Sequence, residues 1–147
     1  MPGNMNTRIA HHRPSRYLVW PHCYNTRDLG GLPTREGKTT RWKAVIRSDS
    51  LSRLTEAGHQ ALRAYGVTTI IDVRSPHEVI QAPSIMITDL DDPLQYLNLP
   101  IEKYYPHVSA LIQQATTRGE VYGIILDQYP DAVVAIMRAM VTAPPGG

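Results

Sequence analysis

The segment 67–73, Val-Thr-Thr-Ile-Ile-Asp-Val, constrains the fold more than any other part of the chain. Six of its seven residues are β-branched when threonine is included, and polar and apolar residues do not alternate along it. Such a run is typical of a strand that lies inside a sheet and is covered on both faces. We therefore expect an α/β fold with a mostly parallel sheet and flanking helices.

Helix signals lie on both sides of this run. Residues 54–65 place apolar side chains near one helical face, with Thr55 as a candidate N-cap and Gly66 as the C-terminal stop. After the strand, Ser75-Pro-His-Glu78 offers a cap, a proline at the first helical position and a glutamate at the capping-box position. The order helix, strand, helix is a unit of an α/β sheet.

The C-terminal third is predicted to be helical, over residues 106–117, 119–128 and 131–142. The last of these segments carries one apolar stripe at helical spacing, which predicts packing against a core. The stripe consists of Val133, Ile136, Met137, Met140 and Val141.

Shorter extended segments are expected at residues 17–20, 42–46 and 94–99. Residues 24–37 are rich in glycine and other turn formers and predict a loop. We expect residues 1–15 to be a disordered polar arm and residues 16–147 to belong to one folded unit.

Composition excludes several classes of protein. A length of 147 residues with 42% hydrophobic residues fits one domain, and a net charge of +2 is too small to indicate a nucleic-acid partner. No apolar run is long enough to span a membrane. A single cysteine rules out an internal disulfide framework and favours a reducing compartment, so we expect a cytoplasmic protein.

Arg27 and Asp28 stand just before Gly30-Gly31 in a turn-rich loop. Arginine can hold a phosphate with two hydrogen bonds, and a neighbouring aspartate can orient it. Adjacent glycines allow a tight turn and a close approach of the backbone to a ligand. The alternative is a structural Arg–Asp pair that fixes the loop, and the residue types alone leave both open.

Arg47 directly follows the predicted strand 42–46, and Asp72 and Arg74 lie at the carboxyl end of the predicted strand 67–73. Ligand sites of open α/β sheets gather at the carboxyl ends of strands, and two arginines converging on one crevice would suit a phosphoryl group. Alternatively, Asp72 and Arg74 anchor neighbouring loops through hydrogen bonds.

Cys23 follows His22, but it lacks the surroundings of a nucleophile. A phosphate-binding thiolate needs a helix N-terminus and an arginine six residues later, where this chain has Leu29 in a turn-rich loop. We interpret Cys23 as a buried, inert residue, with a redox-sensitive thiol as the alternative. The six histidines are scattered without the spacing of metal ligands, so no metal and no cofactor are expected.

Three phrases together resemble the atypical microbial protein tyrosine phosphatases that open with an N-x-R-D-L-G-G loop. They are Asn25-Thr-Arg-Asp-Leu-Gly-Gly31, Ile46-Arg-Ser-Asp-Ser-Leu-Ser-Arg-Leu-Thr55 and Ile70-Ile-Asp-Val-Arg-Ser75. The resemblance runs from about residue 18 to residue 147. It implies a hydrolase of phosphoric monoesters, acting on a phosphorylated protein or a small phosphate ester, with Arg27, Asp28, Arg47, Asp72 and Arg74 as candidate phosphate-pocket residues.

The family places its nucleophile on a later Cys-x5-Arg loop, which this chain does not contain. We therefore expect the N-terminal part of a phosphatase-like domain, without a catalytic residue and inactive alone. Lacking the strand that precedes the nucleophile, this part is expected to self-associate.

Two other functions are consistent with parts of the sequence. Asp72-Val-Arg-Ser-Pro-His-Glu-Val79 also resembles a stretch of rhodanese-like sulfurtransferase domains, but no cysteine follows residue 23. The upstream phrases favour the phosphatase. The third alternative is a non-catalytic module that binds phosphate or a protein partner.

Overall fold

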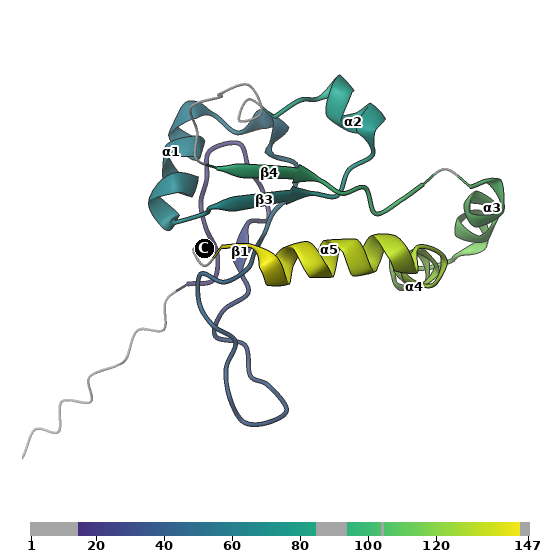
Figure 1. Cartoon of the computed structure of the whole chain (residues 1–147), viewed down its shortest axis with the longest axis horizontal. Coiled ribbons are helices and arrows are strands. Elements are labelled where there is room, and N and C mark those ends of the chain that lie inside the picture. The colour runs from purple at the N-terminus through teal and green to yellow at the C-terminus, as the bar shows by residue number, and fades with distance from the viewer. Residues whose placement is uncertain (1–14, 85–93, 104, 145–147) are drawn as a thin grey trace, which may run out of the picture.

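The computed structural model describes residues 15–84, 94–103 and 105–144, so the predicted disordered arm lies almost wholly outside it. The fold class is confirmed as mixed α/β with a helical C-terminal third (Figure 1). In chain order the elements are β1 (Arg27–Asp28), β2 (Ile46–Arg47), the 3-10 helix η1 (Leu51–Arg53), α1 (Glu56–Tyr65), β3 (Thr69–Asp72), α2 (Pro76–Gln81), β4 (Gln95–Asn98), α3 (Pro106–Gln114), α4 (Arg118–Gln128) and α5 (Pro130–Thr142).

β3 and β4 form a parallel pair in which Ile70 is aligned with Tyr96 and Asp72 with Asn98. Both strands were predicted from sequence, and their parallel direction agrees with the predicted sheet. The prediction that β3 lies inside a sheet is wrong for the described residues. Its sheet has two strands, and Ile70 is its only buried residue, because the edge opposite β4 faces a groove and not another strand.

α1 begins and ends where its capping residues predict. The Thr55 side chain accepts a hydrogen bond from the N–H of Gly58, and Gly66 ends the helix with a φ of 102°. The buried face of α1 carries Leu62, which packs with Leu54 and Ile70 in the main hydrophobic core. This core also holds the side chains of Trp20 and Cys23.

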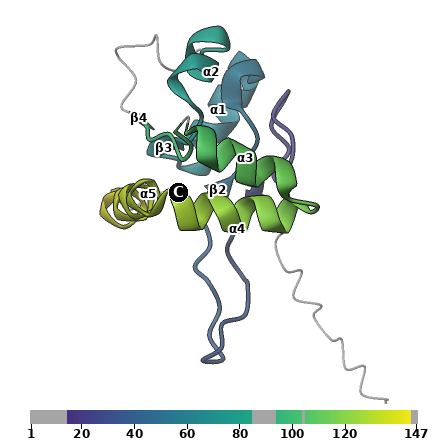
Figure 2. The same cartoon turned by 90° about the vertical axis from the view of Figure 1, so that its right-hand side faces the viewer.

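The predicted strands 17–20 and 42–46 are wrong in extent. Tyr17 and Trp20 make only isolated bridges, and the regular strand of the second segment is β2. Left-handed backbone at Lys43 (φ 60°) interrupts the extended conformation, and His22 (φ 58°) turns the chain back after Trp20. Figure 2 shows the chain between β1 and β2 projecting away from the sheet as a long loop.

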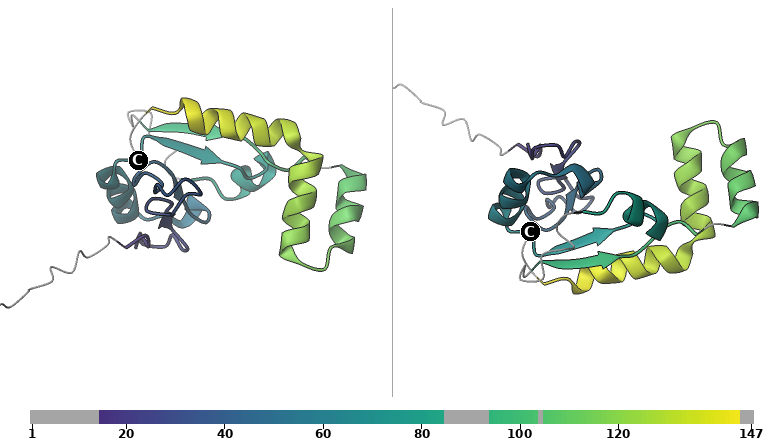
Figure 3. Two further views of the ribbon diagram at one scale, coloured as in Figure 1. Left: turned by 90° about the horizontal axis from the view of Figure 1, so that it is seen from below. Right: turned by 90° about the horizontal axis from the view of Figure 1, so that it is seen from above.

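The three C-terminal helices are confirmed within a few residues of their predicted bounds. α3 and α4 lie side by side as a hairpin (Figure 3), and they enclose a second small core of Val108, Ile125 and Tyr129. α5 then runs back along the sheet, antiparallel to β3 (Figure 1). It ends beside Thr68, whose hydroxyl donates a hydrogen bond to the carbonyl oxygen of Pro144 at 3.4 Å.

The apolar stripe of α5 does not pack as predicted. None of its residues is buried, and Met137 and Val141 are 57% and 85% exposed. The prediction of a core-packed stripe is therefore wrong for the described chain. The physical reason is that α5 lies over an open groove beside β3, so its apolar side chains border the groove and are not enclosed between packed surfaces.

Candidate functional site

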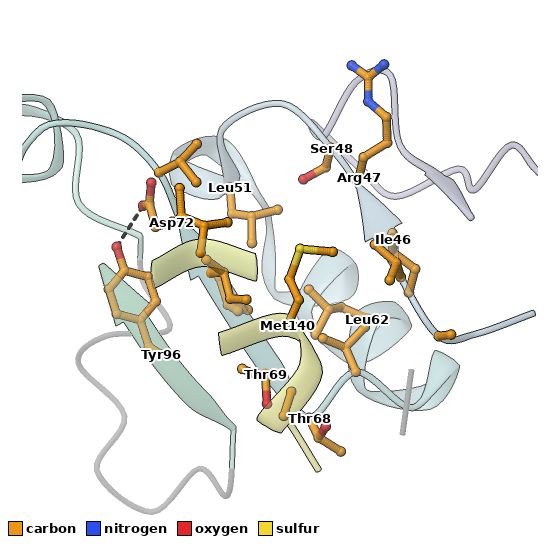
Figure 4. Close-up of a pocket in the computed structure, with 18 of the residues that line it drawn as sticks. Ile46, Arg47, Ser48, Leu51, Leu62, Thr68, Thr69, Asp72, Tyr96 and Met140 are labelled. Atoms are coloured by element: carbon orange, nitrogen blue, oxygen red, sulfur yellow. Dashed lines mark hydrogen bonds between the residues drawn. The ribbon is translucent and has the colours of Figure 1, made fainter. Parts of the chain in front are cut away.

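An open groove of about 1180 Å³ runs along the free edge of β3. Residues 67–74 form one wall and residues 41–51 form the other. Figure 4 shows Ile46, Leu62 and Met140 pointing toward one another across it. Small-molecule pockets usually enclose about 300–1,000 Å³, so this groove has room for more than a small ligand.

Among the described residues, the edge of β3 that faces this groove pairs with no other strand. The carbonyl of Thr68 accepts from the N–H of Gln95 in β4 at 2.9 Å, and that of Asp72 accepts from the N–H of Leu99, the residue after β4, at 2.8 Å. In a parallel pair alternate residues face the same partner, so the backbone groups of Thr69 and Ile71 face the other edge. The N–H and C=O groups along that edge have the alternation needed to form hydrogen bonds with a further strand.

A compact polar cluster closes the carboxyl end of β3. Arg74 donates to the Asp72 carboxylate from Nε at 3.0 Å and from Nη2 at 2.6 Å, while its Nη1 donates to the Ala82 carbonyl at 2.9 Å. The Tyr96 hydroxyl donates to the same carboxylate at 2.7 Å. All three guanidinium nitrogens thus have acceptors within the protein. These contacts anchor the loop after β3 to Asp72 and to the end of α2.

These contacts change the acidity of the cluster. Burial alone would raise the pKa of Asp72, but the hydrogen bonds from Arg74 and Tyr96 outweigh burial and hold the pKa below its usual value. Burial, followed by the hydrogen bond to Asp72, raises the pKa of Tyr96 to about 12. Asp72 is therefore held as a carboxylate and Tyr96 as a neutral phenol at neutral pH.

Asp28 is fully buried and acts as a hub for the loop between β1 and β2. One carboxylate oxygen accepts from the N–H of Gly30 at 2.7 Å. The other accepts from the N–H of Lys43 at 2.8 Å and from the Tyr65 hydroxyl at 2.6 Å. The carboxylate contacts no arginine side chain in the described part of the chain, so it does not orient Arg27 there.

The two glycines of this loop make room for Trp42. A Cβ on Gly30 would lie 2.5 Å from the Cα of Trp42, and one on Gly31 would lie 2.6 Å from the indole Cζ2. Gly31 also has a φ of 72°. The close approach expected from the glycine pair is therefore to an indole ring of the same chain.

Arg27 and Arg47 are directly opposite one another in the antiparallel pair of β1 and β2. The Arg27 guanidinium lies over the Tyr17 ring, 4.6 Å from its centroid, and donates to the Tyr17 hydroxyl at 3.0 Å. Figure 4 shows the Arg47 side chain pointing away from the groove.

Cys23 is 5% exposed and belongs to the main core. Its sulfur accepts a hydrogen bond from the Thr26 hydroxyl at 3.2 Å and donates to Asp49 Oδ1 at 3.3 Å. Burial raises the pKa of the thiol, and the Asp49 carboxylate raises it further. A protonated, buried thiol is a poor nucleophile, which agrees with the interpretation of Cys23 as inert.

The groove therefore brings together three of the five predicted phosphate-pocket residues, since Arg47, Asp72 and Arg74 line it. Arg27 and Asp28 are not in its lining. Sequence reasoning missed Tyr65 and Tyr96, the phenols that bind the two aspartates. No local pattern could have found them, because they stand 37 and 24 residues from their partners.

Over residues 15–84, 94–103 and 105–144, no group of three or more metal-ligating side chains could hold a metal ion. No helix in this described part is long and apolar enough to cross a membrane.

Comparison with known proteins assigns the family. No curated protein matches the chain. A family model described as the tyrosine phosphatase family matches residues 18–146, which is most of the chain. That range includes β1 to β4 and the three C-terminal helices. The chain therefore belongs to the tyrosine phosphatase family.

Proposed function

We propose that this chain is the N-terminal part of an atypical microbial tyrosine phosphatase of the N-x-R-D-L-G-G type, and that it is inactive alone. The observation that carries the proposal is the groove along β3. Within residues 15–84, 94–103 and 105–144 its β3 edge pairs with no strand, its walls are mostly apolar, and its lining contains no cysteine. The only cysteine of the chain is buried in the core and has a raised pKa.

The groove fits the strand that precedes the nucleophile in this family. A strand there would pair with the backbone of Thr69 and Ile71 and would cover Leu62 and Met140. α5 returns the chain to the start of β3, at Thr68, so a strand that begins there runs parallel to β3. Its carboxyl end would lie next to Asp72 and Arg74, where ligand sites of parallel sheets gather.

In the complete enzyme the reaction has two steps. A cysteine thiolate attacks the phosphorus of a phosphorylated protein or small phosphate ester, and an acid protonates the leaving oxygen. Water then cleaves the phosphocysteine, which releases inorganic phosphate and restores the thiolate. We propose that Asp72 and Arg74 act as one anchored unit in the wall of the phosphate pocket, while Arg47 borders the groove with its side chain turned outward.

A chimaera tests this proposal. The chain alone should not hydrolyse para-nitrophenyl phosphate. Joining an apolar strand, a Cys-x5-Arg loop and a helix after Gly147 should produce turnover. Turnover should disappear when the added cysteine is replaced by serine and should persist in Cys23→Ser. A chimaera that shows one cooperative thermal transition but no turnover would overturn the proposal, as would hydrolysis by the unextended chain that Cys23→Ser abolishes.

We further propose that the chain, as a separate polypeptide, is cytoplasmic and self-associates through the groove and the exposed face of α5. An unpaired strand edge beside exposed apolar residues invites pairing between molecules. Size-exclusion chromatography should show oligomers that bind a hydrophobic dye, and the chimaera should be more monomeric. A compact monomer that binds no dye would contradict the self-association.

A further inference from the structure

Three side chains form a row across three extended segments near the N-terminus. Tyr17 is bridged to Arg27, and Arg27 is aligned with Arg47 across the β1–β2 pair. Residues directly opposite one another in antiparallel pairs project from the same face and have neighbouring Cβ atoms. Tyr17, Arg27 and Arg47 therefore share one face and follow one another across it.

This face is turned to solvent. Thr26 and Asp28, which alternate with Arg27 along the chain, are 2% and 0% exposed and lie on the inner side. On the outer side Tyr17 is 63% exposed, and Arg47 is exposed as well. Arg47 borders the groove, but its side chain points away from it (Figure 4), so the guanidinium groups of the row lie outside the groove proposed to hold the catalytic strand.

The two arginines lack a carboxylate partner among the described residues. The nearest acids along the chain are engaged elsewhere: Asp28 binds the donors described above, and Asp49 Oδ1 accepts from the N–H of Tyr24 at 2.8 Å. Like charges directly opposite one another on two strands are destabilising. An anion between the two guanidinium groups would remove that repulsion.

One of the two guanidinium groups is already positioned. Arg27 is held by the Tyr17 ring and hydroxyl, so it has less conformational freedom to lose on binding. Only one of its five N–H donors is used by the hydroxyl. A guanidinium fork matches the oxygen spacing of a phosphate group and can bind it with two hydrogen bonds.

We propose that Arg27 and Arg47 form a binding site for a phosphate dianion, with Tyr17 as the positioning residue for Arg27. The site lies outside the groove and needs no catalytic cysteine. It can therefore operate in this chain as it stands, and in a complete phosphatase it would hold a second anionic group away from the reacting one.

Inorganic phosphate is the probe, and the arginine Nε–Hε signals of the full chain are followed by NMR at low ionic strength. The Arg27 and Arg47 signals should shift saturably, while sodium chloride at matched ionic strength should not reproduce the shift. Arg27→Gln and Arg47→Gln should each weaken binding by about three- to tenfold. Arg138→Gln removes one exposed arginine of α5 and is the matched control; it should change binding less than twofold.

Two further variants keep the charge and test the geometry. Arg47→Lys should weaken phosphate binding although the net charge is unchanged, and Tyr17→Phe should weaken it by a smaller factor because Arg27 loses a hydrogen-bond partner. If Arg138→Gln and Arg47→Gln weaken phosphate binding equally, binding depends only on the net charge of the protein, and the proposal is overturned. So would a saturable shift at Arg74 with none at Arg27 and Arg47. Variant folding is checked by the near-ultraviolet circular dichroism of the two tryptophans.

Discussion

The core around α1 and the face around α5 are both built from apolar helix stripes, yet they end up in opposite environments. Leu62 of α1 is 1% exposed, and it packs with Leu54 and Ile70. Met137 and Val141 of α5 are 57% and 85% exposed. The first helix has a partner surface within the described chain, and the second lies over a groove.

This contrast shows that an apolar stripe on a helix indicates that the helix needs a packing surface. It does not show that the described chain supplies that surface. A helix gains most of its stability from packing its apolar face, so an uncovered stripe contributes little. The polar groups of the two regions differ in the same way, in whether they face protein partners or the groove. Asp28, near α1, has three donors from three parts of the chain, whereas the backbone groups of Thr69 and Ile71 face the groove.

The sharpest test of this comparison shortens one side chain in each region. Leu62→Ala should lower the free energy of unfolding by about 2–5 kcal/mol, because it leaves a cavity in a packed core. Met137→Ala should change it by about 0.5 kcal/mol or less, because the side chain is mostly in water. Urea denaturation followed by tryptophan fluorescence measures both. Similar losses for the two variants would show that α5 has a packing partner in solution.

A second test compares a buried with an exposed carboxylate. Asp28→Asn keeps the shape of the side chain but replaces one accepting oxygen with an NH2 group, which faces N–H donors and cannot accept from them. It should lower the free energy of unfolding by about 2–3 kcal/mol. Asp127→Asn changes an exposed residue of α4 and should stay within about 0.5 kcal/mol. The same denaturation curves serve both variants. A neutral Asp28→Asn would mean that the loop between β1 and β2 does not depend on this hub.

Local signals in the sequence predicted local structure well. The caps Thr55 and Ser75 place the starts of α1 and α2 correctly, because a cap depends only on residues within one turn. The candidate site depends on contacts between distant residues, and these were not predictable. Asp28 was selected as a partner for an arginine, but it binds Tyr65, which depends on how α1 docks. The α5 stripe was correctly identified as apolar, yet none of its residues is buried, because burial depends on what α5 lies against and not on the spacing of its own residues.

A third test concerns the anchor at the edge of the groove. Arg74→Gln should lower the free energy of unfolding by about 1–2 kcal/mol at pH 7, because Asp72 keeps its bonds from Tyr96 and from the Arg74 backbone. The pKa of Asp72 is depressed in the folded state, so the stability that it contributes is present above its unfolded pKa of about 3.9 and is lost as the pH falls through the folded pKa. The difference between wild type and variant should therefore shrink below about pH 4. A difference that stays constant to pH 2 would assign the loss to packing alone.

The smallest expected effect compares the two phenols that donate hydrogen bonds to Asp28 and Asp72, which are Tyr65 in α1 and Tyr96 in β4 beside the groove. Burial, followed by the hydrogen bond to Asp28, raises the pKa of Tyr65 to about 12. Burial, followed by the hydrogen bond to Asp72, raises the pKa of Tyr96 to about 12. The folded pKa of each lies above the unfolded value of about 10, so the stability that each contributes is complete below pH 10 and is lost as the pH rises toward 12. Absorbance at 295 nm should show late ionisation that Tyr65→Phe and Tyr96→Phe each reduce by one tyrosine. If the face beside the groove is the looser region, Tyr96 should ionise at lower pH than Tyr65, and the reverse order would contradict the comparison.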